Sequence, residues 1–387
     1  MDTQNTPIHI RLWNRDFWLL AIANLLMTMA VYMQILHYPI MMNEAQVTHQ
    51  QIALAMGVQG VGLFVLGAFC SFLVQKFRRN HVCEAAVLVM AACFVLPMLL
   101  KVEQLPYHWM AIGTRFLTGA FFGLAQMILI STLIVDCTES FQRTEANYAA
   151  AWFGRFAVSL GPLLVCILVR LTDISTSLWV SVGLAGAAAV IIGLVRFPFR
   201  APEENVPHVS LDRFFLPEGW LLFVNLFLTT LSIGLVLATA HHTIFFSMLM
   251  VGFLAALLAG KFIFVNAELK SEAVAGMLVI GAALMIMLTR EGPSVPYITP
   301  VLIGLGAGLV GSRFLLFFIK LSRHCQRGTS QSSFFLAWEA GISIGIGLGY
   351  LIFNRKTSLE VALIILSLAL ILYVTLTHSW YLKHKNR

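Results

Sequence analysis

Residues 197–218 read FPFRAPEENVPHVSLDRFFLPE, and they form the longest polar stretch of a chain of 387 residues. The stretch contains four prolines and lies close to the middle of the sequence. On both sides of it, apolar runs of about twenty residues alternate with short polar connectors. The pattern predicts an N-terminal half, residues 1–196, and a C-terminal half, residues 219–387, joined by a linker of residues 197–218.

The composition agrees with a chain that lies mostly in a membrane. Hydrophobic residues make up 59% and charged residues 11%, against about 45–50% and 25% in soluble domains. These values exclude a soluble enzyme and a secreted disulfide-stabilised domain. A transmembrane β-barrel is also excluded, because its strands read as alternating segments of about ten residues.

The apolar runs number twelve, six in each half. A helix needs about 20 apolar residues to cross the hydrocarbon layer, and backbone groups in lipid must be satisfied within the helix. The sequence therefore predicts an all-α membrane protein with 12 transmembrane helices. The predicted spans are 17–37, 51–74, 82–100, 108–132, 146–169, 177–196, 219–240, 243–265, 272–289, 297–320, 330–352 and 358–380.

The positive charges indicate the orientation. With the N-terminus inside, seventeen of the 25 Lys and Arg residues fall in inside segments and five in outside segments. This bias predicts that both termini and the linker are cytoplasmic, in a multi-pass protein of the cytoplasmic (inner) membrane. The net charge of +7 comes from these connectors, so nucleic acid is not an expected partner.

Two sequence echoes indicate that the halves repeat. Asn24 and Thr28 in the first span recur as Asn225 and Thr229 in the seventh, and the pattern of 143–147 recurs in type at 327–331. Halves of six helices related by a pseudo-two-fold axis along the membrane normal form a known transporter architecture.

Three stretches carry a family resemblance. Span four contains Arg115-Phe-Leu-Thr-Gly119-Ala-Phe-Phe-Gly123, and span eleven begins Arg327-Gly-Thr-Ser-Gln-Ser and continues to Glu339-Ala-Gly. The connector between spans two and three reads QKFRRNHV over residues 75–82. With these stretches the chain resembles the major facilitator superfamily, and within it the twelve-span efflux-type permeases. The resemblance implies the fold of that superfamily and transport by alternating access.

The connector between spans two and three departs from the family pattern. Gln75 stands where the family has an acid, and Arg78 stands where it has a glycine. The family's acid is implied to latch the cytoplasmic side to a neighbouring helix. The resemblance thus makes Gln75, Lys76, Arg78 and Arg79 a candidate cytoplasmic gate, with a latch that is weakened or made by neutral hydrogen bonds. The basic residues alternatively serve only as membrane anchors.

Charged residues within the spans are candidates for function, because a charge at the bilayer centre costs about 2.5–3.5 kcal/mol or more. Arg115 is a candidate for a fixed charge in a central cavity that attracts an anion or tunes a proton site, and Gln126 lies on the same helix face. Glu339 is a candidate proton carrier, since a low dielectric favours a neutral carboxyl group. Arg155 lies at a similar depth, so an ion pair between Arg155 and Glu339 is the alternative. Arg313 is expected to anchor its helix at the membrane surface.

Further polar and aromatic residues are candidates for the substrate cavity. They are Asn24 and Thr28, the stripe Asn225, Thr229 and Ser232 in span seven, and the mid-span residues Trp152 and Trp338. The alternative for the hydroxyl and amide groups is that they join helices by hydrogen bonds. The glycines at 341, 345 and 349 indicate close helix packing.

Other chemistry is not indicated. No Walker loop, G-x-S-x-G or H-E-x-x-H motif is present, and the six cysteines form no C-x-x-C pair, so we expect no enzyme, no cofactor, no metal and free thiols. The expected function is secondary active transport of a small organic solute by a monomer, as efflux in exchange for protons. The alternatives are a sugar or organic-anion symporter and a non-transporting membrane protein on a transporter fold.

Overall fold

The computed structural model describes residues 12–99, 107–139, 142–197, 206–264 and 268–385. These residues form helices and connectors without a strand, and twelve helical segments are long and apolar enough to cross a membrane, as predicted. The segments are Arg15–Glu44, His49–Lys76, Arg79–Pro97, His108–Asp136, Arg143–Leu171, Ile174–Leu194, Pro217–Leu237, Thr243–Phe262, Lys270–Thr289, Val295–Leu321, Arg327–Ile352 and Arg355–His384.

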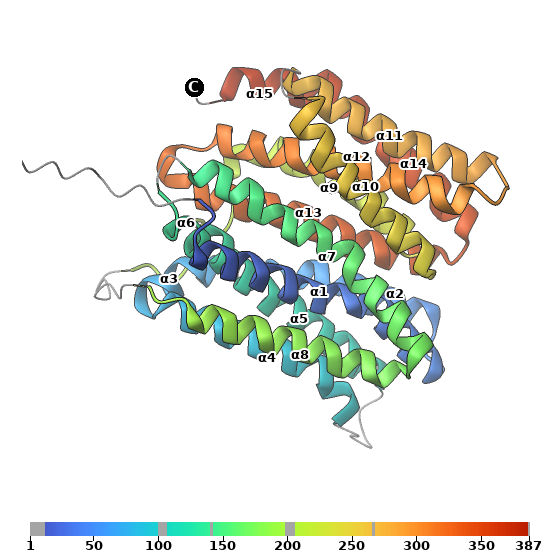
Figure 1. Ribbon diagram of the computed structural model, residues 1–387, viewed down its shortest axis with the longest axis horizontal. Coiled ribbons are helices and arrows are strands. Elements are labelled where there is room, and N and C mark those ends of the chain that lie inside the picture. Colours follow the sequence, from blue (N-terminus) through green and yellow to red (C-terminus); the bar gives the residue numbers. More distant parts are fainter. Residues whose placement is uncertain (1–11, 100–106, 140–141, 198–205, 265–267, 386–387) are drawn as a thin grey trace, which may run out of the picture.

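Nine segments consist of one long α-helix or of one preceded by a short turn. These helices are α1 (Arg15–Glu44), α4 (Arg79–Leu99), α7 (Arg143–Leu171), α8 (Ile174–Leu194), α9 (Trp220–Leu237), α10 (Thr243–Phe262), α11 (Leu269–Thr289), α12 (Val295–Leu321) and α13 (Arg327–Ile352). They run along one common direction, with the N-terminal half below the C-terminal half in Figure 1. The start of α1, the linker and the C-terminus lie at the same end of the bundle, which we name the linker end; the opposite end is the far end.

The other three segments are interrupted. The second is α2 (His49–Gly62), a 3-10 turn (Gly67–Phe69) and α3 (Cys70–Lys76). The fourth is α5 (Tyr107–Ile128), a π-helical turn (Leu129–Leu133) and α6 (Ile134–Asp136). The twelfth is α14 (Arg355–Leu372), a π-helical turn (Tyr373–Thr377) and α15 (His378–His384).

Glycines allow the second and fourth segments to pack backbone against backbone. A Cβ atom on Gly119 would lie 2.2 Å from the carbonyl oxygen of Gln59, and one on Gly123 would lie 2.6 Å from that of Leu63. The Arg-x-x-x-Gly element of span four therefore has a packing role at its glycines.

Helix α13 of the C-terminal half contacts both halves. Its glycines 341, 345 and 349 lie against α9, which confirms the packing prediction from their spacing. Across the interface between the halves, α13 packs on α2, and α7 packs on α10. A Cβ on Gly347 would lie 2.7 Å from the Cα of Gly57, so the backbones of α13 and α2 are nearly in contact.

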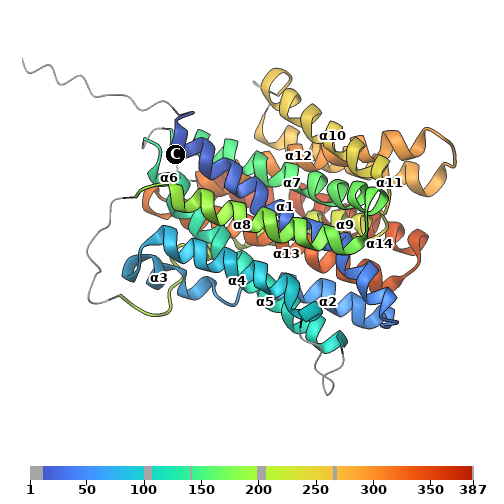
Figure 2. The same ribbon diagram turned by 60° about the horizontal axis from the view of Figure 1, so that its bottom comes forward.

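The linker is described from residue 206 onward, and residues 198–205 lie outside the described part. From 206 to 216 it runs beside α3 at the linker end in both views (Figures 1 and 2). The backbone N–H of Ser210 donates to the carbonyl of Ala68 at 2.9 Å, and His208 stacks on Phe72. The linker thus packs on the N-terminal half before it enters α9.

Candidate functional site

A cavity of about 60 Å³ lies between the two halves. Helices α1, α5, α7, α12 and α13 and the π-turn of the fourth segment contribute to it, so both halves form its wall. Counted along the helices at about 1.5 Å per residue, the position of the lining residues puts the cavity between the middle of the bundle and its linker end. Its lining residues are Asn24, Thr28, Gln126, Ile130, Asn147, Ala150, Ala151, Gly154, Arg155, Leu315, Gln331, Phe334, Phe335, Trp338 and Glu339.

On the N-terminal side of the cavity, three predicted residues form one hydrogen-bonded group. The amide of Gln126 donates to Oδ1 of Asn24 at 2.7 Å and lies 2.8 Å from the Thr28 hydroxyl oxygen. Asn24 in turn donates to the carbonyl of Ala150 on α7 at 3.0 Å. These bonds fix α1, α5 and α7 relative to one another at the cavity wall.

Arg155 brings a cation to the same cavity. Its Nη1 donates to the Ser312 hydroxyl on α12 at 2.8 Å, and its guanidinium carbon lies 4.8 Å from the ring centre of Trp152 and 5.9 Å from those of Phe334 and Trp338. These distances are within the range of cation–π attraction. Nε and Nη2 are buried and have no hydrogen-bond partner among the described residues.

The backbone of α12 leaves room for this arginine. A Cβ atom on Gly311 would lie 2.9 Å from Nε of Arg155 and 2.8 Å from the Trp338 ring. A larger residue at position 311 would therefore displace both side chains.

Glu339 lines this cavity and also a second one of about 10 Å³, which is enough for one water molecule. Its Oε2 accepts a hydrogen bond from the Tyr32 hydroxyl at 3.0 Å, so Glu339 is bonded to Tyr32 rather than ion-paired with Arg155. Arg115 lines the second cavity, with its guanidinium 5.0 Å from the Tyr38 ring centre. Gln126 lines the cavity of about 60 Å³, whose lining does not include Arg115.

The predicted polar stripe of span seven lies away from the cavity. Asn225 donates to the carbonyl of Ala369 on α14 at 2.9 Å. Thr229 and Ser232 donate to carbonyls of their own helix, those of Asn225 and Thr229. The Asn225 bond corresponds to the alternative of helix joining, since it links α9 to α14 inside the C-terminal half.

Arg313 differs from the surface anchor that we expected from the sequence. It forms an ion pair with Glu272 on α11, and both residues are largely buried. Spacing along the chain could not reveal this pair, because residues 272 and 313 lie on different helices.

Sequence reasoning did not assign several lining residues to a cavity, among them the aromatic residues Phe334 and Phe335 and the polar residues Tyr32, Asn147 and Gln331. Tyr32 lies four residues after Thr28, which itself lies four residues after Asn24. The three side chains therefore share one helix face, and this spacing could have predicted Tyr32. The sequence indicated Asn147 and Gln331 only as equivalent positions of the two halves. Both line the cavity. Within the described part of the chain, Asn147 Oδ1 and Gln331 Nε2 have no hydrogen-bond partner.

Comparisons with known proteins agree with this architecture. The profile of the Major Facilitator Superfamily matches residues 20–346. The chain belongs to this superfamily. The resemblance to the superfamily in three short stretches is thereby confirmed, and the chain is a multi-pass membrane protein of a transporter family.

Two solved structures show the superfamily fold. A mutant of the nucleoside transporter NupG has a TM-score of 0.65 and 9% identity, over 93% of this chain and 99% of that chain. A bacterial homologue of the iron transporter ferroportin, in an outward-facing state, has a TM-score of 0.68 and 15% identity, over 95% of this chain and 99% of that chain. No curated protein sequence matches this chain.

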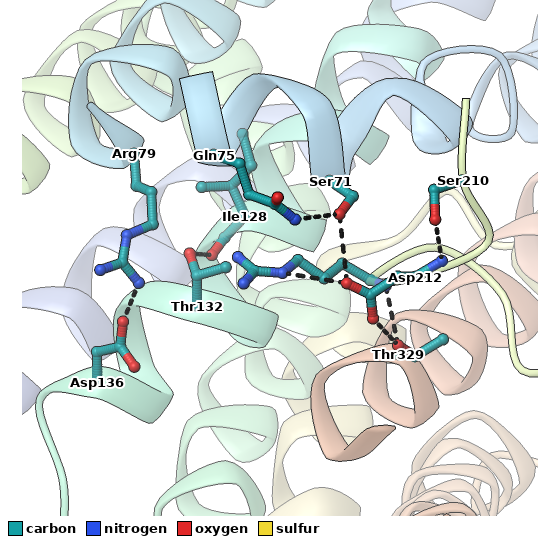
Figure 3. A network of polar contacts seen from close by, with 10 residues as sticks. Ser71, Gln75, Arg79, Ile128, Thr132, Asp136, Ser210, Asp212 and Thr329 are labelled. Atoms are coloured by element: carbon teal, nitrogen blue, oxygen red, sulfur yellow. Dashed lines mark hydrogen bonds and ion pairs between the residues drawn. The ribbon is translucent and has the colours of Figure 1, made fainter. Parts of the chain in front are cut away.

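Helix α3, which carries the predicted gate residues Gln75 and Lys76, is joined to the linker (Figure 3). Gln75 donates to the Ser71 hydroxyl at 2.8 Å. Ser71 donates to Asp212 of the linker at 3.3 Å, and Thr329 at the start of α13 donates to the other oxygen of Asp212 at 3.0 Å. The backbone N–H of Arg213 donates to the Thr329 hydroxyl at 2.8 Å. Asp212 therefore connects the N-terminal half with the C-terminal half.

The basic members of the motif have separate contacts. Arg79 forms an ion pair with Asp136 at the end of the fourth segment (Figure 3), and the Lys76 ammonium lies 5.2 Å from the Phe72 ring centre. Arg78 lies in the connector between α3 and α4.

Proposed function

We propose that the protein is a secondary active transporter that moves a small organic solute by alternating access, as efflux coupled to protons. The observation that carries this proposal is the cavity between the halves, which combines aromatic side chains with the buried charged residues Arg155 and Glu339. Transport by rocking two halves around a central site needs a site whose wall is shared by both.

The two ends of the bundle differ in the way that alternating access requires. At the far end, a cavity of about 550 Å³ opens between the halves and is lined by parts of α1, α7 and α13, among others. At the linker end, the Asp212 bonds hold the second segment and α13 together. This conformation resembles a state that is closed at the linker end, which we propose to be the cytoplasmic side.

Asp212 then takes the place of the acid that the gate motif lacks. The family's acid would lie at position 75, whereas here a carboxylate from the linker reaches Ser71 one helical turn away. A latch of this kind has to break when the linker end opens. The bonds of this latch are partly exposed. Each therefore stabilises the closed state by no more than about 1.5 kcal/mol, which is compatible with repeated opening.

Glu339 is our candidate for the coupling proton. It touches both the substrate cavity and the small cavity beside Arg115, and its only bonding partner in the described structure is the Tyr32 hydroxyl. A carboxyl group at the interface between moving halves changes its surroundings during the cycle, so its affinity for a proton changes as well.

The test is flux of a compound panel in proteoliposomes, with and without a pH gradient. We expect at least one organic compound to move only in the presence of protein, and its movement against a concentration gradient to need the pH gradient. Glu339→Gln should abolish this accumulation and leave downhill exchange intact. Accumulation without a proton requirement would contradict the coupling, and no protein-dependent movement of any compound would favour the non-transporting alternative.

An organic-anion symporter is the second candidate. It is favoured by Arg155, a buried cation with unoccupied donors at the cavity. The direction of proton flow relative to solute flow in the same assay separates the two candidates.

A further inference from the structure

Arg155 is a buried cation that has no counter-ion among the described residues. Its side chain is 3% exposed, and the ion pairs in the described residues do not include it. The nearest candidate carboxyl group, Glu339, is bonded to Tyr32 instead. An unpaired charge and unoccupied donors are costly in a low dielectric, so the site is arranged for an anion that enters from outside the protein.

The unoccupied atoms indicate the shape of that anion. Nη1 is bonded to Ser312, whereas Nε and Nη2 form the remaining edge of the planar guanidinium. Two parallel N–H donors on one edge match the two oxygens of a carboxylate. Ser312 holds the opposite side of the guanidinium in place, so its orientation is fixed before a ligand arrives.

The surroundings of Arg155 indicate what is attached to the carboxylate. Phe334 and Trp338 lie beside Arg155, and Phe335 lines the same cavity. The amide of Gln331, which has no partner among the described residues, supplies a hydrogen-bond donor. Flat apolar groups pack well on aromatic side chains. The closed volume of about 60 Å³ is below the roughly 300–1,000 Å³ of ligand pockets, so the ligand enters when the halves separate.

We propose that the substrate is an organic anion, a carboxylate on a flat apolar body, and that Arg155 binds its carboxylate. The proposal rests on the transport function given above and names its substrate class. Arg115 is less suited, although it also has buried donors without partners in the described structure, because it adjoins the cavity of about 10 Å³ and does not line that of about 60 Å³.

The first experiment measures binding to the purified full-length protein in detergent. The probes are benzoate, benzamide and benzylamine, which share a ring and carry a negative, a neutral and a positive group. Quenching of tryptophan fluorescence, with Trp152 and Trp338 near Arg155, and calorimetry report binding. We expect benzoate to bind at least tenfold more tightly than the other two probes.

The variants test the role of Arg155. Arg155→Gln should lower benzoate affinity more than tenfold and benzamide affinity by a smaller factor, because only benzoate also loses a charge partner. Arg155→Lys should restore benzoate affinity in part, because Lys lacks the planar fork. Arg170→Gln removes an exposed charge from the same helix and is the matched control. Equal binding of the three probes, no binding of benzoate, or full affinity in Arg155→Gln would overturn the proposal.

Flux in proteoliposomes separates this proposal from the proposed function. Protein-free liposomes give the leak of each probe. Protein-dependent flux of benzylamine or benzamide but not of benzoate would leave the transporter in place and overturn the substrate class. Arg155-dependent binding of benzoate without any flux would support the anion site and contradict transport.

Discussion

The hydroxyl of Tyr32 on α1 donates to Oε2 of Glu339 on α13 at 3.0 Å, and this bond crosses the interface between the two halves. A donor that faces a carboxylate stabilises its ionised form. We expect Tyr32→Phe to retain proton-driven transport with a changed pH profile, because Glu339 loses its hydrogen-bond donor. The measurement is initial transport rate against pH in wild type, Tyr32→Phe and Glu339→Gln.

Glu339→Gln removes the titrating group itself, whereas Tyr32→Phe removes only its hydrogen-bond partner. Gln cannot titrate, so accumulation should lose its dependence on the pH gradient while exchange continues. If Tyr32→Phe gives an unchanged pH profile, the bond has only a structural role. In that case its loss should appear as a lower melting temperature in detergent.

Asp212 is expected to control opening at the linker end. Asp212→Ala removes the acceptor for Ser71 and Thr329, so the fraction of molecules open at this end should rise severalfold. A cysteine introduced at Ser131, which lies against Gly328 of α13 in the closed state, should then react faster with a membrane-impermeant maleimide in a variant without the native cysteines.

Glu218→Ala is the control for this experiment, since it removes another exposed acid of the linker. It should leave the labelling rate unchanged. Equal labelling rates in Asp212→Ala and the parent protein would contradict the latch.

Gly119→Ala should destabilise the protein by about 1–3 kcal/mol, as overpacking does. The new Cβ would meet the backbone oxygen of Gln59, which cannot move without α2. Gly113→Ala is the matched control on the same helix, because nothing lies within 4 Å of a Cβ there. Helix propensity predicts a neutral or stabilising effect at 113. Thermal unfolding in detergent measures both, and equal melting temperatures would contradict the packing argument.

The orientation remains a prediction from the positive charges. Reporter fusions at residue 213 and at the C-terminal Arg387 should both report the cytoplasm. A periplasmic signal from either fusion would show that the linker end faces the other side.

The fold was accessible from the sequence because hydrophobic length alone defines membrane-spanning helices. The interruptions of the second, fourth and twelfth segments were not, since each falls in an apolar run that reads as one helix. The cavity was predicted in part. Six of the predicted residues line it together, namely Asn24, Thr28, Gln126, Arg155, Trp338 and Glu339. Asn225 instead bonds to α14, although its sequence surroundings match those of Asn24.

That difference has a physical reason. Sequence spacing fixes which residues share a helix face, but the rotation of the helix in the bundle decides what this face meets. The same limit applies to Arg313, whose partner Glu272 could be found only in three dimensions. The Asp212 bonds could not be predicted because they join a linker to two helices that are far apart in sequence.

The position of Asp212 within the segment that joins the halves makes closure of the linker end an intramolecular reaction. Its probability depends on an effective concentration, which linker length and stiffness set and which reaches the millimolar range for short linkers. A longer linker would dilute the carboxylate around Ser71 and Thr329. The balance between open and closed states could then be tuned by insertions near residue 206, without a change in any residue that contacts the transported compound.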